Sequence, residues 1–266
     1  MRKITIGAKN YSVPGSWNEM TAEQLCFLAM ILTKQCTAPE IKLKMLLYCL
    51  SARIRRYRRA DGDGYSVAFP DETVWLKPEQ LTTLGFVFDF LFTDTDKGPE
   101  LDIQLTRNPF PIYYSESMIL AGPDDALTNI SYGQFIMLQS WQRQMKHDFE
   151  TALNNFLPVI WKDSVFTTSE DGAAEWFQDV DPAVKTVMYW YFLGSMRFIQ
   201  EKFPRVFPGG SDADGGDIFD IQQRIVDEMA SGDVTKKEQV KQSLLYDALY
   251  TLEMAMERDE KTKRGQ

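Results

Sequence analysis

The chain contains very few of the residues that build common catalytic and metal sites. Among its 266 residues there are one histidine and three cysteines. A single histidine excludes most histidine-dependent catalysis and most zinc sites. Three cysteines without metal-like spacing also do not make up a disulfide framework. The sequence therefore predicts no metal site and no disulfide-stabilised fold.

Long apolar runs are also missing. The two longest runs are Leu25–Leu32 and Val187–Leu193, whereas a membrane-spanning helix needs about 18 or more apolar residues. Residues 1–13 include no apolar stretch of signal-peptide length. We therefore expect a protein without a membrane span that stays in the cytoplasm.

Nucleotide-binding and nucleophile motifs are absent as well. The sequence has no Gly-x-x-x-x-Gly-Lys, no Gly-x-Gly-x-x-Gly and no Gly-x-Ser-x-Gly segment. Residues 212–217 resemble the start of a calcium loop, but Asp217 stands where such a loop needs glycine. These absences predict a protein that is not an enzyme and holds no cofactor. Paired carboxylates are not excluded, so a carboxylate-based metal-dependent hydrolase remains an alternative.

The charge balance is acidic. There are 29 Lys and Arg against 38 Asp and Glu, which gives a formal net charge of −9. A chain with this charge repels nucleic acid and acidic membranes as a whole. We therefore expect protein partners, with nucleic acid disfavoured and no membrane contact.

Hydrophobic periodicity predicts a mainly α fold of about seven helices with two small β-hairpins and one irregular arm. The expected hairpins are residues 2–13 and 65–76, and the arm is residues 93–123. The expected helices follow the Thr21 capping box, Pro39, Pro78, Ser131 and Pro182, and two more span about 218–230 and 235–258. The helix after Ser131 is predicted to continue to Phe156.

The domain organisation expected from this pattern is a single mainly helical body over residues 1–266. Within it, residues 1–92 hold the hairpins and the first helices, and residues 93–130 include the arm. Residues 131–266 form the remaining helical part, with a flexible loop at 204–217 because prolines and glycines gather there. The hairpins are too small to stand alone, which favours one continuous body.

One strongly basic cluster stands out against the acidic background. Five of the seven residues 53–59 are arginine, and we expect them at the C-terminal end of the helix that begins at Pro39. There they either complement the helix dipole and pair with the chain's own acids, or bind an acidic protein partner. The candidate partner-binding residues are Arg53, Arg55, Arg56, Arg58, Arg59 and Trp17.

Three stretches resemble structural and tail-assembly proteins of bacteriophages and prophages of gut bacteria. They are residues 13–21 (VPGSWNEMT), residues 127–135 (LTNISYGQF) and residues 225–252, where a Ser-Gly-Asp-Val-Thr turn joins two helices. The resemblance covers about 45 residues and includes no catalytic signature. It implies a non-enzymatic role in building a virion.

On this resemblance we expect a phage morphogenesis protein, either a tail-assembly chaperone or a virion component near the tail. Its partners would be other phage structural proteins and, in an oligomer, further copies of the chain. It would act in the host cytoplasm during assembly or remain in the virion. A head–tail connector subunit, whose arm at 93–123 embraces its neighbours in a ring, is the alternative.

Overall fold

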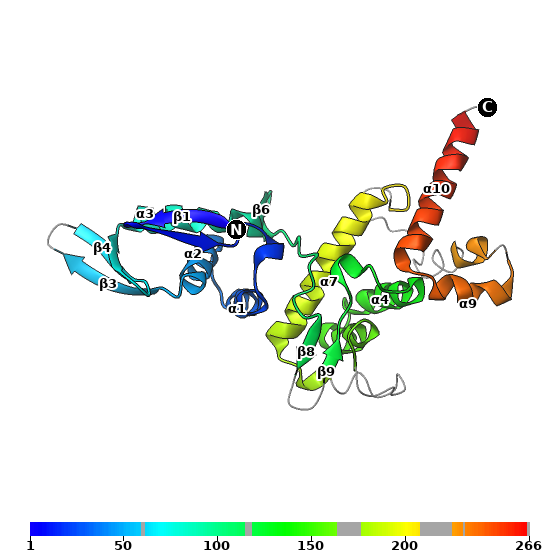
Figure 1. Cartoon of the computed structure of the whole chain (residues 1–266), viewed down its shortest axis with the longest axis horizontal. Coiled ribbons are helices and arrows are strands. Elements are labelled where there is room, and N and C mark those ends of the chain that lie inside the picture. Colours follow the sequence, from blue (N-terminus) through cyan, green and yellow to red (C-terminus); the bar gives the residue numbers. More distant parts are fainter. Residues whose placement is uncertain (60–61, 115–118, 164–176, 208–224, 231, 265–266) are drawn as a thin grey trace. The chain divides into compact units, whose positions relative to one another are not determined.

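The structure is a computed structural model that describes residues 1–59, 62–114, 119–163, 177–207, 225–230 and 232–264 (Figure 1). Contacts along the chain group the residues into two compact units, Met1–Leu105 and Thr106–Gln266. Where the sequence favours one continuous body, the structure thus places a division inside the expected arm. No helix within the described residues combines the length and the apolar character needed to span a bilayer.

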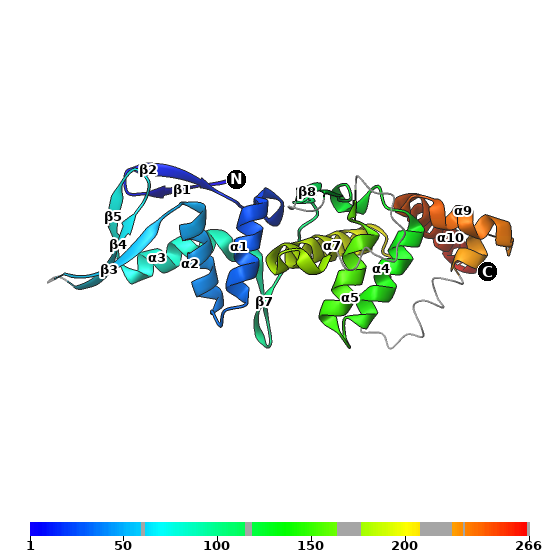
Figure 2. The same cartoon turned by 90° about the horizontal axis from the view of Figure 1, so that it is seen from below.

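The first unit combines three α-helices with three small sheets. Its elements in chain order are β1 (Arg2–Ile6), β2 (Lys9–Val13), the 3-10 helix η1 (Trp17–Glu19), α1 (Ala22–Leu32), α2 (Ala38–Cys49), β3 (Arg53–Arg59), β4 (Gly62–Ala68), β5 (Thr73–Leu76), α3 (Pro78–Gly85), η2 (Phe86–Leu91), β6 (Phe92–Thr95) and β7 (Gly98–Leu101). In Figure 2 the β1–β2 hairpin and β5 lie along one side of this unit, and helices α1 and α2 lie on the other.

Local sequence signals account for most boundaries in this unit. The hairpin predicted over residues 2–13 is confirmed, with Ile6 and Val13 buried. The capping box at α1 is also confirmed, because the Thr21 hydroxyl accepts from the Gln24 amide while the Gln24 side chain accepts from the Thr21 amide. Helix α1 then buries Leu25, Leu28, Ala29 and Ile31 in the core.

The second unit is richer in helix. Its elements are β8 (Ile112–Tyr114), β9 (Ile119–Ala121), η3 (Asp125–Leu127), α4 (Tyr132–Gln144), α5 (Phe149–Phe156), η4 (Leu157–Val159), β10 (Lys162–Asp163), η6 (Phe177–Asp179), α7 (Pro182–Lys202), α9 (Val234–Gln242) and α10 (Leu245–Arg264). As predicted, α7 begins at the Asp181 cap and buries much of its surface. The C-terminal half of α10 extends away from the rest of the unit (Figure 1).

The predicted mainly α fold is wrong. Helix makes up 56% and strand 18% of the structure, and this strand content is close to the roughly 20–25% of ordinary globular domains. The described residues form four small antiparallel sheets and about nine helices. The described residues therefore form a mixed α/β fold, in which small sheets accompany the helices.

Apart from the two-residue strand β10, the extra strands come from two places in the sequence. The arginine segment forms β3, and the expected irregular arm contains both strands of the β6–β7 hairpin beyond Phe92 and the β8–β9 pair. Strands of three or four residues carry too little alternation to stand out from a loop in the sequence.

Two predicted helices are also divided. The helix expected from Ser131 to Phe156 is broken into α4 and α5, because the Asp148 carboxylate accepts from the Thr151 amide and caps a new helix. The helix expected at 235–258 is likewise divided into α9 and α10 around Ser243. The predicted flexible loop at 204–217 and the predicted helix at 218–230 lie largely outside the described residues.

Candidate functional site

The arginine cluster lies on a strand, and its predicted position at the end of a helix is wrong. Helix α2 stops at Cys49, because the Ser51 amide donates to the Tyr48 carbonyl at 3.0 Å and the Ala52 amide donates to the Leu47 carbonyl at 2.8 Å. This pair of bonds closes the helix end with Ser51 in the left-handed region at φ +50°. The arginines that follow therefore do not lie at a helix end and do not complement a helix dipole.

Strand β3 is held in place by its pairing with β4. Ile54 stands opposite Val67 in the antiparallel register, and Val67 is fully buried. β-branched and aromatic residues such as Ile54 and Tyr57 favour a strand. The pairing with β4 then carries the arginines along a hairpin that projects from the unit in both views (Figures 1 and 2).

Two of the five candidate arginines have described side chains, and both are exposed. Arg53 and Arg55 lie on the same face of β3, because side chains alternate along a strand. Neither guanidinium has an acidic partner within the described residues. Arg56, Arg58 and Arg59 are on the same strand, and their side chains lie outside those that the structure describes.

Strand β3 is also the edge of its sheet. The strand order is β3-β4-β5, so β4 covers one side of β3. Across the described ranges, no strand pairs with its other side. An edge strand offers unpaired backbone N–H and C=O groups to any extended chain, and charged side chains restrict which chains can approach.

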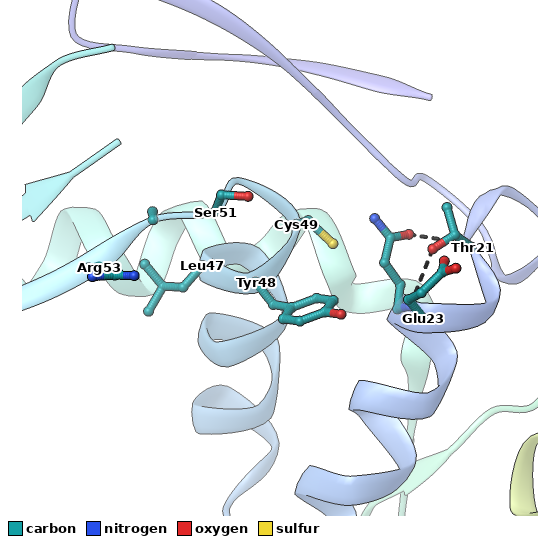
Figure 3. A pocket seen from close by; sticks show the side chains of 9 residues that line it. Thr21, Glu23, Leu47, Tyr48, Cys49, Ser51 and Arg53 are labelled. Carbon is teal, nitrogen blue, oxygen red and sulfur yellow. Dashed lines mark hydrogen bonds between the residues drawn. The ribbon is translucent and has the colours of Figure 1, made fainter. Parts of the chain in front are cut away.

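A hollow of about 520 Å³ lies at the N-terminal end of β3, between the start of α1 and the end of α2 (Figure 3). Arg53 belongs both to the hollow and to the strand. The residues that line it are Thr21, Glu23, Gln24, Leu47, Tyr48, Cys49, Ser51, Ala52 and Arg53. The Tyr48 ring is 40% exposed and stacks on Phe27 with centroids 4.0 Å apart.

The electrostatics of the hollow favour binding over catalysis. A hydrogen bond from Thr21 lowers the pKa of the Glu23 carboxyl, so this group is ionised at neutral pH. Burial raises the pKa of the Cys49 thiol to about 12, so the thiol remains neutral and is a poor nucleophile. The hollow therefore combines the apolar parts of Leu47 and Tyr48 with one anion, Glu23, and one cation, Arg53.

The other predicted partner-binding residue, Trp17, is buried. Its side chain is only 2% exposed, so it is part of the core and cannot serve as a surface anchor. From the sequence alone, its position just after the hairpin is equally compatible with a structural role and with a surface anchor. The single histidine, His147, is exposed in the turn between α4 and α5.

Among the described side chains, no group of three or more His, Cys, Asp or Glu residues is placed to hold a metal ion. The hollow itself was missed by sequence reasoning, because it forms only where the start of α1 meets the end of α2. The segment beside it, Leu50-Ser51-Ala52, connects a helix to a strand but contains no glycine or proline, so the sequence does not mark the turn there.

In the second unit, the segments around Ile130–Tyr132 and Ser243–Leu245 lie against each other. The Tyr132 amide donates to the Ser243 carbonyl at 2.9 Å, and the Leu245 amide donates to the Ile130 carbonyl at 2.9 Å. A Cβ on Gly133 would come within 3.1 Å of the Lys241 carbonyl oxygen, so a small residue is needed there. The two stretches thus form one structural element in which α4 and α10 begin together.

Comparison with known proteins returned no relative, because no family model, no curated protein and no solved structure matches the chain.

Proposed function

We propose that this chain is a non-enzymatic phage morphogenesis protein, either a tail-assembly chaperone or a tail-region virion component. It works through protein–protein contacts. The observation that carries the proposal is the exposed arginine strand β3, whose Arg53 and Arg55 have no acidic partner among the described side chains. The phage-like stretches supply the biological setting.

The charge distribution explains how such a contact would work. The chain has a net charge of −9, and yet five arginines are concentrated in seven residues of β3. Acidic proteins would be repelled by most of the surface and attracted at this strand, which orients the encounter. Arginine suits this role because its planar guanidinium binds carboxylates in a bidentate manner.

The hollow supports a binding role and gives no support to hydrolysis. Its one carboxylate, Glu23, has no second described acid beside it among the lining residues. Its thiol is held neutral by burial. A carboxylate-based hydrolase needs two such groups or a metal between them, so the described geometry favours the assembly function.

Deletion of the coding sequence from phage-producing cells tests this proposal. We expect loss of complete tailed particles, and rescue by the wild-type chain supplied in trans. The variant Arg53→Glu, Arg55→Glu should fail to rescue, whereas Lys3→Glu, Lys34→Glu should rescue. Lys3 and Lys34 are exposed in the same unit, so the control makes an equal change in net charge. A normal yield of complete particles without the chain would refute the proposal.

A further inference from the structure

We infer that β3 binds an acidic, extended segment of a partner protein as an added fourth strand of the β3-β4-β5 sheet, and that an apolar residue of this segment enters the hollow beside Arg53. This inference rests on the proposed function and names the chemistry of the partner. It combines three observations about one place in the first unit: a free strand edge, exposed positive charge and an adjoining cavity.

The free edge supplies the backbone contacts. β3 is seven residues long, and β4 alone pairs with it in the described part of the chain. A segment that adds at such an edge gains main-chain hydrogen bonds that do not depend on its sequence. Specificity must then come from the side chains that the edge presents.

The arginines supply that specificity. Opposite charges directly across two strands stabilise the pairing, and like charges destabilise it. An acidic segment therefore pairs favourably with Arg53 and Arg55, whereas a basic segment does not. A second copy of β3 is excluded for the same reason, since it would place arginines opposite arginines.

The hollow determines where an uncharged residue of the segment fits. A chain that pairs along β3 reaches the hollow as it passes Arg53, which lines the cavity. Leu47 and Tyr48 are among the residues that line it, and the ionised Glu23, which also lines it, repels a carboxylate (Figure 3). The segment should thus carry its acids along β3 and an apolar side chain at the hollow.

Nucleic acid is the competing ligand for an arginine strand. Its phosphates would satisfy the guanidinium groups, but the chain's net charge of −9 opposes the approach of a polyanion. A sugar–phosphate backbone also lacks the alternating N–H and C=O groups that an edge strand pairs with. A protein segment is therefore the favoured ligand.

The test is fluorescence anisotropy of the full-length chain with a labelled synthetic peptide of about ten residues, a length sufficient to pair along a strand. Its sequence alternates Glu with Val or Thr and has one Leu near an end. We expect Arg53→Glu, Arg55→Glu to weaken binding by about tenfold or more, because repulsion replaces attraction. Lys3→Glu, Lys34→Glu should leave binding unchanged, and circular dichroism should show that both variants are folded.

Two further probes separate strand addition from simple charge attraction. A peptide that is N-methylated at alternate residues keeps its charge but cannot complete the ladder, and we expect it to lose binding. Tyr48→Ala should weaken binding of the Leu peptide and have no effect on a peptide with Ala at that position. Equal binding of the methylated peptide, no binding of the acidic peptide, or stronger binding of single-stranded DNA would overturn the inference.

These outcomes are distinguishable from failure of the proposed function. If Arg53→Glu, Arg55→Glu abolishes particle assembly while the methylated peptide binds as well as its parent, the strand addition is wrong and the assembly role stands. If the chain is dispensable for particles while the peptide binds as expected, the assembly role is wrong and the binding site stands.

Discussion

At the scale of single residues, the buried lysine of α7 depends on one neutral partner. Lys185 is 5% exposed and donates to the Asn154 side-chain oxygen at 3.2 Å. We expect Asn154→Ala to lower the free energy of unfolding by roughly 1–3 kcal/mol, because the ammonium loses its acceptor inside the protein. Lys185→Met should cost less, since the group it leaves without this partner is the neutral Asn154 amide and not a buried ammonium. Urea denaturation of the two variants measures this, and an equal or larger loss for Lys185→Met would contradict it.

A partly buried cysteine thiol and a partly buried tyrosine hydroxyl predict a loss of stability at alkaline pH. Burial raises the pKa of Cys49 from 9.0 to about 12 and that of Tyr246 from 10.0 to about 12. Both groups hold their protons more tightly in the folded chain, so their contribution is complete below the unfolded pKa and is lost as pH rises toward the folded pKa. The free energy of unfolding should therefore decline above about pH 9, where the unfolded thiol begins to ionise.

The variant Cys49→Ser tests the share of the thiol in this decline. Serine does not titrate in that range, so the slope of unfolding free energy against pH should be smaller between pH 9 and 10 than in the wild type. Chemical denaturation at several alkaline pH values measures the slope. An unchanged slope would show that Cys49 is accessible to solvent when the chain is folded.

Sequence reasoning succeeded at this scale where a residue acts on its immediate neighbours. The helix starts predicted at Thr21, Ser131 and Pro182 are all found in the structure, because a helix start depends on side chains and amides only two or three positions apart. It did not separate a buried Trp17 from an exposed one, since burial depends on residues far along the chain. It placed the arginine cluster on the wrong element.

At the scale of elements, the turn between α2 and β3 decides where the arginines lie. Ser51 occupies the left-handed position that closes α2, at φ +50°. Glycine is the usual residue there because it has no Cβ to strain, and its absence made the helix appear to continue in the sequence. The arginine cluster was therefore predicted at the end of a helix, whereas in the structure it forms strand β3.

This turn provides a stability prediction. Ser51→Gly should raise the free energy of unfolding by about 0.5–1 kcal/mol. Glycine removes the left-handed strain, which costs an L residue about 1–2 kcal/mol. Part of this gain is offset because glycine also increases the conformational entropy of the unfolded chain. Ser51→Val should lower it, since a β-branched side chain suffers more at this φ. Thermal and urea unfolding of both variants check the signs. Destabilisation by glycine would mean that the Ser51 side chain, and not its backbone, holds the turn.

At the scale of the whole molecule, the sequence favoured one body and the structure has two compact units that meet at 105/106. Periodicity identifies elements one at a time, but the grouping of elements depends on contacts between distant residues, which one sequence does not reveal. The same limit explains why the hollow and the free edge of β3 were not predicted. Both exist only after the sheet and helices of the first unit have assembled.

The division predicts that residues 1–105 fold on their own. The unit has its own buried residues, including Leu28, Met45 and Leu105, and is long enough for an independent core. We expect the isolated fragment to show a cooperative thermal transition and to bind the acidic peptide with an affinity close to that of the full chain. A fragment that lacks a cooperative transition would show that the second unit is needed for its fold.

The central claim, a role in building phage particles, is tested most directly by quantitative mass spectrometry of purified particles and of total lysate from the same cells. The account predicts one of two patterns. The chain is present in particles at a fixed ratio to tail or shell proteins, or it is abundant in lysate and missing from particles as an assembly factor would be. If the cells make no particles while they produce the chain, or if the amount of the chain does not follow that of the phage structural proteins, the claim is contradicted.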